Sequence, residues 1–199
     1  PSVQLVGVDG SKPRLVAVGG KGAATPWAWT PDGKQLLVAR IRKEGPPERV
    51  LVSVSGDLQT VLGVGPIPGA RFSPDGSQIA FTQNRPADQK GFDVVLLPVR
   101  GGSAPVKVAA DASSPVWSPD GKRLLFISDR NGSNDLWSIR IEGGKPAGVP
   151  EFVKERVDGL LDVSPEGDCF YRTRNLVRDL FTAGIDPRTG RLTEEPRQM

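Results

Sequence analysis

The chain has 199 residues, a formal net charge of only +3, a single cysteine and no histidine. The lack of histidine excludes serine–histidine and cysteine–histidine nucleophile pairs and every zinc site with a histidine ligand, and one cysteine cannot form an intrachain disulfide or a thiolate metal cluster. The small net charge is far from the concentrated positive field of nucleic-acid binding, and no apolar run approaches the roughly 20 residues that span a bilayer.

The first predicted elements are two short strands at residues 3–8 and 15–18. Both segments are rich in valine and leucine, and the turn-forming residues Asp9, Gly10 and Pro13 lie between them. Alternating apolar residues bounded by such turn residues are typical of a β-hairpin. These strands align with the second half of a unit that recurs later in the chain.

Four copies of one turn motif divide the rest of the chain. Each copy reads Ser or Thr, Pro, Asp or Glu, and Gly, and the four prolines are Pro31, Pro74, Pro119 and Pro165. Their spacings of 43, 45 and 46 residues indicate a repeated supersecondary unit, because periods in the forties are typical of solenoids and propellers. Proline presets φ for the turn, the acid hydrogen-bonds locally, and glycine accepts the positive φ that the hairpin needs.

Each motif lies between two predicted strands. An apolar residue, usually aromatic, stands two positions before the proline, and alternating apolar residues begin three positions after the glycine. The third copy continues through a polar loop at 128–134 into a strand at 135–139, a Gly-rich turn at 142–145 and a short fourth strand near 151–153. These patterns predict four strands per repeat, which is the content of one propeller blade.

At these residues the chain resembles the WD-like repeats of TolB-type β-propellers. Residues 117–126 match the W-S-P-D-G-K-x-[IL]-x-F segment of that family almost letter for letter, and residues 29–34 are nearly as close. The fourth copy departs most, with Val163 in place of the aromatic residue and Glu166 in place of Asp. The resemblance implies a propeller fold and a periplasmic or otherwise extracytoplasmic bacterial setting. It does not define an activity, because propellers of this type occur as free proteins, as sensor domains and as regulatory parts of peptidases.

The predicted fold class is therefore an all-β propeller with four full four-stranded blades and an N-terminal half-blade. The half-blade covers residues 1–20 and the blades cover about 25–64, 68–110, 114–154 and 159–199, as a single propeller domain or a fragment of one. An open array exposes strand edges that β proteins normally cover. We therefore expect a section of a six- to eight-bladed ring, completed by further blades or by association of chains through the open edges.

Most acidic side chains recur in fixed places of the repeat, so we assign them to structure. Asp93, Asp135 and Asp179 share one position before the third strand, where they can accept N–H groups from a neighbouring loop. A calcium site over residues 129–135 is not expected, because that loop lacks the terminal bidentate glutamate. Cys169 has no base that could activate its thiol. The sequence predicts no catalytic residue, no metal ligand and no cofactor.

The aromatic residues are predicted to pack one blade against the next. They are Trp29, Phe72, Phe81, Trp117, Phe126 and Trp137. Trp27 is less regular, because Ala70, Pro115 and Leu161 align with it, and it is the aromatic residue we would test first for ligand contact.

Charge suggests one binding face. In a propeller, the loops between second and third strands emerge on the same side of the ring. The cations expected there to contact an acidic partner, together with Trp27, are Arg42, Lys43, Arg85, Arg130 and Arg174. Scattered surface arginine is the alternative explanation, because Glu44, Asp88 and Asp129 dilute the positive charge.

Two functions remain open. The favoured one is a non-catalytic module that holds a protein partner or a small ligand on a loop face, with neither nucleic acid nor a membrane span. The alternative is the regulatory propeller of a larger serine peptidase, prolyl-oligopeptidase-like or tricorn-like, whose catalytic domain lies outside this segment. A Gly-x-Ser-x-Gly nucleophile elbow would identify such a domain, and it does not occur in these residues.

Overall fold

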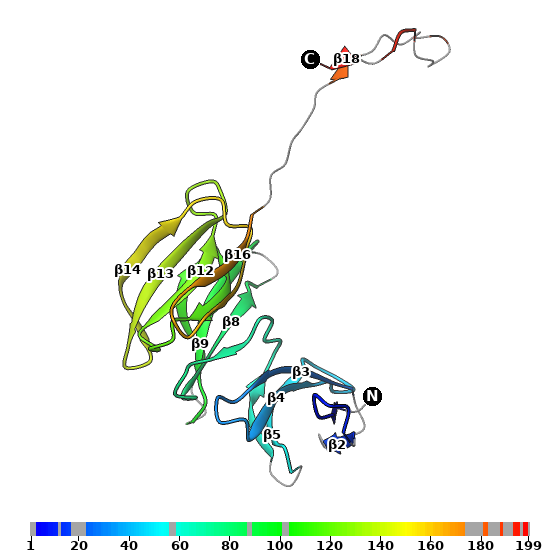
Figure 1. The fold of residues 1–199 in the computed structure, drawn as a ribbon, viewed down its shortest axis with the longest axis vertical. Coiled ribbons are helices and arrows are strands. Elements are labelled where there is room, and N and C mark those ends of the chain that lie inside the picture. The colour runs from blue at the N-terminus through cyan, green and yellow to red at the C-terminus, as the bar shows by residue number, and fades with distance from the viewer. Residues whose placement is uncertain are drawn as a thin grey trace.

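The protein is built from short antiparallel sheets that follow one another in chain order (Figure 1). The computed structural model describes residues 3–11, 13–16, 23–55, 59–86, 89–100, 104–173, 181–182, 188, 193–195 and 197–198, and over these ranges it contains strands, turns and loops but no helix. The same ranges accordingly include no helical segment with the length and apolarity that crossing a membrane requires. The predicted all-β organisation is confirmed.

Three of the sheets have four strands each, joined up and down in sequence order. Blade 1 consists of β3 (Ala24–Trp29), β4 (Gln35–Arg40), β5 (Glu48–Ser53) and β6 (Gln59–Val64). Blade 2 consists of β7 (Arg71–Phe72), β8 (Gln78–Asn84), β9 (Phe92–Pro98) and β10 (Val106–Ala110). Blade 3 consists of β11 (Ala112–Trp117), β12 (Arg123–Ser128), β13 (Asp135–Glu142) and β14 (Lys145–Lys154).

Three two-stranded pairs complete the described structure. They are β1 (Val3–Leu5) with β2 (Arg14–Val16), β15 (Gly159–Val163) with β16 (Cys169–Arg172), and β17 (Phe181–Thr182) with β18 (Arg197–Gln198). The pair β1–β2 is the predicted half-blade, and β15–β16 is the inner pair of the fourth predicted blade. Among the described residues, β17 pairs with β18 and not with β16. Residues 174–180 and 183–187, on which much of that blade was predicted, lie outside the described residues.

The central strands of each four-stranded sheet are buried on both faces because the sheet lies between two neighbouring sheets. In β4, Leu36 and Val38 join a cluster with Val3 and Val16 of the half-blade, whereas Leu37 joins a cluster with Phe81 of blade 2. The central strands therefore read as nearly continuous apolar runs, and successive side chains alternate between the two clusters. A third cluster joins blades 2 and 3, and a fourth joins blade 3 to β15–β16.

The repeated turn has one hydrogen-bond pattern in its first three copies. In the second copy, the Ser73 hydroxyl donates to Asp75 Oδ1 at 2.6 Å and accepts the Gln78 N–H at 3.0 Å. The equivalent bonds form at Thr30 and at Ser118. The glycine after the acid is left-handed, with φ of +71° at Gly76. The motif therefore fixes the hairpin with its own side chains, as its composition predicts.

Consecutive turns also touch. A Cβ placed on Gly121 would lie 3.4 Å from Cδ of Pro74 in the preceding blade, and one on Gly76 would lie 3.5 Å from Cδ of Pro31. The proline of one turn thus rests against the glycine of the next, which aligns the turns of successive blades along one edge of the array.

The aromatic residues of the interior pack between blades as predicted. Phe81 and Phe126 are fully buried, and Trp117 and Trp137 are only 7% and 9% exposed. Trp29 has the same repeat position as Trp117, yet it is 47% exposed. Among the described residues, only the pair β1–β2 precedes blade 1, and it includes no inner strands that cover Trp29.

One strand is longer than the sequence predicts. A short strand near 151–153 was expected, but β14 runs from residue 145 to residue 154. Gly143 and Gly144 both adopt positive φ, so a tight hairpin turn leads directly from β13 into β14.

Candidate functional site

The candidate site is the edge of the array where the second strand of each blade passes into the third. We call this edge the loop face; it includes the described parts of the loops 41–47, 85–91 and 129–134 and the linkers between blades. Loop and linker lie together there, since Gly65 N–H donates to Pro47 O at 2.7 Å and Val157 N–H donates to Asn134 O at 2.8 Å. Side chains from three blades therefore meet on one side of the molecule.

Arg85 is held by two carboxylates on this face. Its Nε lies 2.8 Å from Asp93 Oδ1 and its Nη1 lies 2.9 Å from Asp111 Oδ1. Lys107 Nζ lies 2.5 Å from the other oxygen of Asp93. Burial opposes ionisation of Asp93, but the ion pairs with Lys107 and Arg85 outweigh it and lower its pKa. The positive charge of Arg85 is thus largely balanced within the protein.

Arg130 lies against aromatic rings. Its guanidinium carbon is 4.7 Å from the centre of the Trp137 ring and 5.5 Å from that of Phe126, and its Nε donates to Ser128 Oγ at 3.0 Å. Burial lowers the pKa of Arg130 although Asp111 opposes this change. A guanidinium over aromatic faces stabilises the loop by cation–π attraction, so part of this side chain serves the fold.

Arg42 and Lys43 lie together on the first loop of the loop face. Both residues are exposed. Arg42 Nε lies 3.9 Å from Glu48 Oε1, whereas Arg40 takes the other oxygen of Glu48 at 2.9 Å through its Nε. A distant, half-exposed ion pair of this kind contributes little to stability.

Two further residues were predicted for this face, Trp27 and Arg174. Trp27 lies on β3, half-buried against the cluster between blades 1 and 2, and its indole Nε1 is buried without a hydrogen-bond partner among the described residues. Arg174 lies outside the described residues. In the described structure, Arg42, Lys43, Arg85 and Arg130 therefore lie on the loop face, and Trp27 lies on the inner strand of blade 1.

Arg49 behaves differently from what its position in the chain suggests. It is a basic residue at the end of the first loop, but it is only 7% exposed. Its guanidinium carbon lies 4.9 Å from the centre of the Phe81 ring in blade 2, and its Nε donates to Gly65 O at 3.2 Å. Burial lowers its pKa. Arg49 is thus a packing residue between blades 1 and 2.

A cavity that sequence reasoning missed opens between blades 2 and 3 on the loop face. Its volume is about 340 Å³, and it is lined by Gly91, Phe92, Asp111, Ala112, Ser113, Ile127, Ser128, Asp129 and Asn134. The left-handed φ of +50° at Asp111 turns the chain directly from β10 into β11 beside this cavity. The loop face thus combines exposed cations on blade 1 with a mixed, partly acidic hollow between blades 2 and 3.

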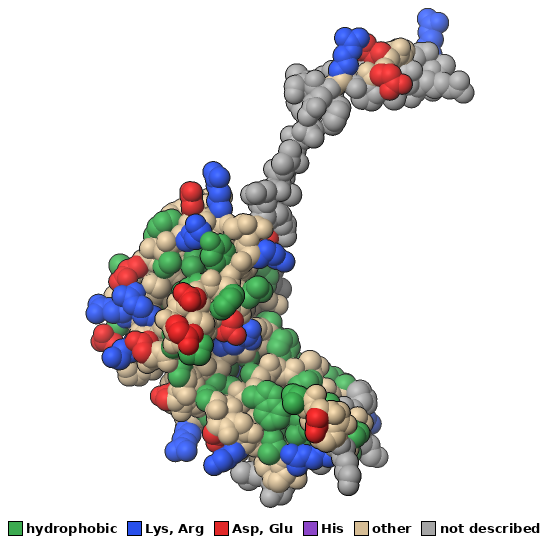
Figure 2. All heavy atoms as spheres, in the orientation of Figure 1, with side chains coloured by type: hydrophobic (Ala, Val, Ile, Leu, Met, Phe, Trp, Pro, Cys, Tyr) green, Lys and Arg blue, Asp and Glu red, His purple; other side chains and the backbone are tan. Residues whose placement is uncertain are grey.

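Charge on the visible surface is mixed. Figure 2 shows Lys and Arg interspersed with Asp and Glu over blades 2 and 3, and hydrophobic side chains gathered over the N-terminal part of the molecule. The surface visible in Figure 2 therefore has no continuous patch of Lys and Arg.

Asp135 serves the fold and does not form part of a metal site among the described residues. Asp135 Oδ1 accepts the Arg156 N–H at 3.0 Å and the Ser133 hydroxyl at 2.9 Å, so the carboxylate in the loop considered for calcium fastens the linker between blade 3 and β15. Within the described part of the chain, no group of three or more Cys, Asp or Glu residues is arranged to hold a metal ion. Burial and the nearby Asp168 raise the pKa of the Cys169 thiol, which disfavours the reactive thiolate.

Sheets of four up-and-down strands, stacked face to face with their turns aligned along one edge, define an open β-propeller array. The family of TolB beta propeller domains (PD40) matches residues 1–177, and the chain belongs to this family.

The relatives of this chain include two proteins that carry a peptidase name and the protein TolB. The chain is 31% identical over 115 residues to the uncharacterized peptidase YuxL of Bacillus subtilis, covering 53% of this chain and 17% of the relative. It is 24% identical over 194 residues to dipeptidyl-peptidase 5 of Porphyromonas gingivalis, covering 83% and 27%. The crystal structure of TolB from Acinetobacter baumannii superimposes with a TM-score of 0.67 at 21% identity, covering 96% of this chain and 47% of that one. This likeness confirms the propeller fold, and the chain spans less than half the length of each of these relatives.

Proposed function

We propose that this chain is a non-catalytic propeller module that binds a protein partner or a small ligand on its loop face, in an extracytoplasmic bacterial setting. Membership of the TolB-type propeller family supports the binding role, and the similarity to TolB supports the setting. The repeats use their acids and aromatic rings for turns and packing, and the loops differ from one repeat to the next. Binding residues are often carried by loops on a rigid scaffold.

The observation that carries this proposal is the state of Arg42 and Lys43. Both are exposed on one loop, and the carboxylate nearest to Arg42 is already engaged by Arg40. An acidic surface can approach this loop without displacing a strong internal ion pair. A modest field of one sign speeds encounter and is screened by salt, so the partner we propose is acidic and its binding depends on ionic strength.

The test is charge reversal on the loop face. We would measure binding of a synthetic peptide of alternating glutamate and serine to the Arg42→Glu, Lys43→Glu double variant at two salt concentrations. The control is the Lys34→Glu, Lys122→Glu variant, which has the same net charge but changes exposed lysines beside the repeated turns, at the opposite edge. We expect binding and its salt dependence to fall in the first variant and to persist in the second. Equal behaviour of both variants would remove the loop face from the proposal.

A second candidate function rests on the two peptidase relatives. Both carry a peptidase name, and the match covers 17% and 27% of their length. In this alternative, the chain is the regulatory propeller of a larger serine peptidase and controls access to a catalytic domain. The sequence of the complete open reading frame around this segment decides between the binding module and the peptidase propeller. A Gly-x-Ser-x-Gly elbow followed by Asp and His would support the peptidase, and its absence would leave the binding module.

A further inference from the structure

Each four-stranded blade ends in an outer strand whose far edge pairs with no other strand in the described structure. These outer strands are β6 in blade 1, β10 in blade 2 and β14 in blade 3. The open edge of a strand offers backbone N–H and C=O groups to any extended chain, so β proteins protect such edges with charged side chains, proline or bulges. A bulge interrupts the ladder of all three outer strands, so only charge and proline distinguish them.

The outer strand of blade 2 is protected by charge. Lys107 is an exposed residue within β10, and its Nζ forms an ion pair with Asp93 Oδ2 of the neighbouring strand. A strand added to this edge would take the lysine out of water, which is unfavourable for a charged group. We therefore expect β10 to reject an additional strand.

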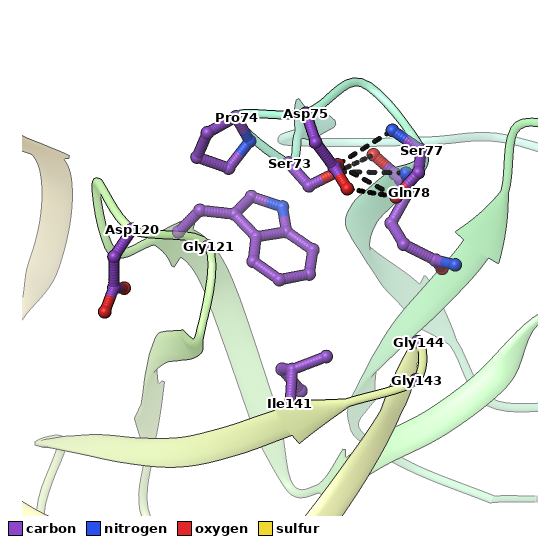
Figure 3. Close-up of a pocket in the computed structure, with 11 residues that line it drawn as sticks. Ser73, Pro74, Asp75, Ser77, Gln78, Asp120, Gly121, Ile141, Gly143 and Gly144 are labelled. Atoms are coloured by element: carbon purple, nitrogen blue, oxygen red, sulfur yellow. Dashed lines mark hydrogen bonds between the residues drawn. The ribbon is translucent and has the colours of Figure 1, made fainter.

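The outer strand of blade 3 is protected by proline. The hairpin turn Gly143–Gly144, which lines a cavity of about 440 Å³ beside the repeated turns of blades 2 and 3 (Figure 3), leads into β14. Pro146 and Pro150 lie in β14 and have no N–H to donate. Proline occurs in edge strands where its nitrogen faces away from the neighbouring strand, so both positions remove donors from the open edge.

The outer strand of blade 1 has neither form of protection. β6 reads Gln-Thr-Val-Leu-Gly-Val and contains no charged residue and no proline. Val61 and Val64 are 54% and 48% exposed. An uncharged edge strand with exposed β-branched residues is suited to pairing with a further strand.

The sheet register shows that Val61 stands in the place of the protecting lysine. Lys107 pairs with Val95 of β9, and Val61 pairs with Val50 of β5. Both partners lie two residues after the acidic residue near the start of the third strand of their blade. Val61 and Lys107 therefore have the same position in successive blades, and blade 1 lacks the charge.

The end of β6 lies beside the basic loop of the loop face. Val64 pairs with Glu48, whose Oε1 lies 3.9 Å from Arg42 Nε. Gly65 N–H donates to Pro47 O of the same loop at 2.7 Å. The open edge of β6 thus leads directly to the exposed cations of the proposed binding site.

We propose that β6 accepts an extended segment of the partner as a fifth strand of blade 1, with acidic residues of that segment beside Arg42 and Lys43. Backbone hydrogen bonds to the open edge supply affinity, and aliphatic side chains at alternate positions pack on Val61. The acidic end meets the basic loop by charge complementarity. This inference rests on the proposed function and defines the partner as a β-strand with an acidic end.

The probe is the peptide acetyl-Glu-Glu-Gly-Thr-Val-Thr-Val-Thr-amide, added to the full chain. β6 runs toward the loop face, so an antiparallel strand begins there with its two acids. We expect saturable binding and slower amide hydrogen exchange within Thr60–Leu62, measured by two-dimensional NMR. The control peptide has the same side chains but N-methyl groups on its Thr and Val residues, so it cannot donate the ladder hydrogen bonds and should not bind. Equal binding of the two peptides would refute strand addition.

A matched pair of variants locates the strand on β6. Val61→Lys places the protecting residue of blade 2 in blade 1 and should weaken binding of the strand peptide roughly three- to fivefold, as suits the loss of one cross-strand contact. Val149→Lys makes the same change at a valine of β14 that is 79% exposed and should have no effect. Equal effects of the two variants would show that added charge, and not the edge of β6, controls binding.

The two peptides separate failure of this inference from failure of the proposed function. If the glutamate–serine peptide binds the loop face while the strand peptide leaves β6 unprotected, strand addition is wrong and the loop face stands. If neither peptide binds, both proposals fall. A second copy of the chain is the competing occupant of the edge. Dimerisation in sedimentation equilibrium that Val61→Lys abolishes would assign the edge to self-association and overturn the peptide strand.

Discussion

Replacement of Trp117 tests whether the aromatic residues of the repeat hold the blades together. Trp117 is 7% exposed, and its indole N–H donates to Arg71 O of blade 2 at 3.2 Å. Truncation of a buried large aromatic residue costs about 3–5 kcal/mol, and loss of a neutral hydrogen bond is worth about 1 kcal/mol of that range. We therefore expect Trp117→Ala to lower the free energy of unfolding by about 3–5 kcal/mol, and Trp117→Phe, which retains a ring, to lower it by about 1–2 kcal/mol.

The control for this experiment is Trp29, the residue in the same repeat position of blade 1. Because Trp29 is 47% exposed and follows a half-blade, Trp29→Ala should cost at most about half as much as Trp117→Ala. Urea unfolding followed by far-ultraviolet circular dichroism measures both costs, because the unfolding midpoint and slope are obtained without relying on indole fluorescence. Equal costs at the two positions, or a cost below about 1 kcal/mol at Trp117, would refute the view that burial between blades sets the contribution of this residue.

Three further predictions follow from the turns and linkers. Asp135→Ala leaves the N–H of Arg156, itself at a left-handed φ of +57°, without its acceptor and should cost about 1–3 kcal/mol in urea unfolding, whereas Asp129→Ala in the same loop should cost little. The hydrogen bonds that lower the pKa of Asp75 contribute stability above its ordinary value of 3.8, and this contribution should disappear as the pH falls through the folded pKa. Unfolding midpoints measured between pH 6 and pH 2 should fall less in Asp75→Asn than in the wild type, and identical pH profiles would contradict this link. Gly121→Ala forces a Cβ at a φ of +68° and should cost about 1 kcal/mol or more, which thermal unfolding can detect; an unchanged midpoint would show that the turn adapts.

Much of the fold follows from local pattern and repetition. The four turns predict where hairpins lie, and the apolar residues that follow them predict strands, which the structure shows as β4 and β12. These features depend on neighbours along the chain, so one sequence is enough to recognise them. The exposure of Trp29 also follows once the half-blade before it is taken into account.

The candidate site was harder to predict because it depends on contacts between blades. Arg85 is neutralised by Asp111, which lies 26 residues further along the chain on a linker, and no local pattern reveals that pair. Arg49 could have been placed correctly, since it shares a face of β5 with the buried Leu51 and therefore points toward Phe81 of blade 2. The cavity on the loop face was not predicted because it forms where blades 2 and 3 meet.

The central claim is that binding takes place at the loop face while the repeated side chains hold the blades together. Amide hydrogen exchange of the full chain, with and without the glutamate–serine peptide, tests this claim most directly because it reports protection along the whole backbone. Binding of the peptide at the loop face should add protection in the loop at 41–47, where Arg42 and Lys43 lie. It should add none in the repeated turns at 30–34, 73–77 and 118–122. Protection confined to the repeated turns, with the loop unchanged, would contradict it.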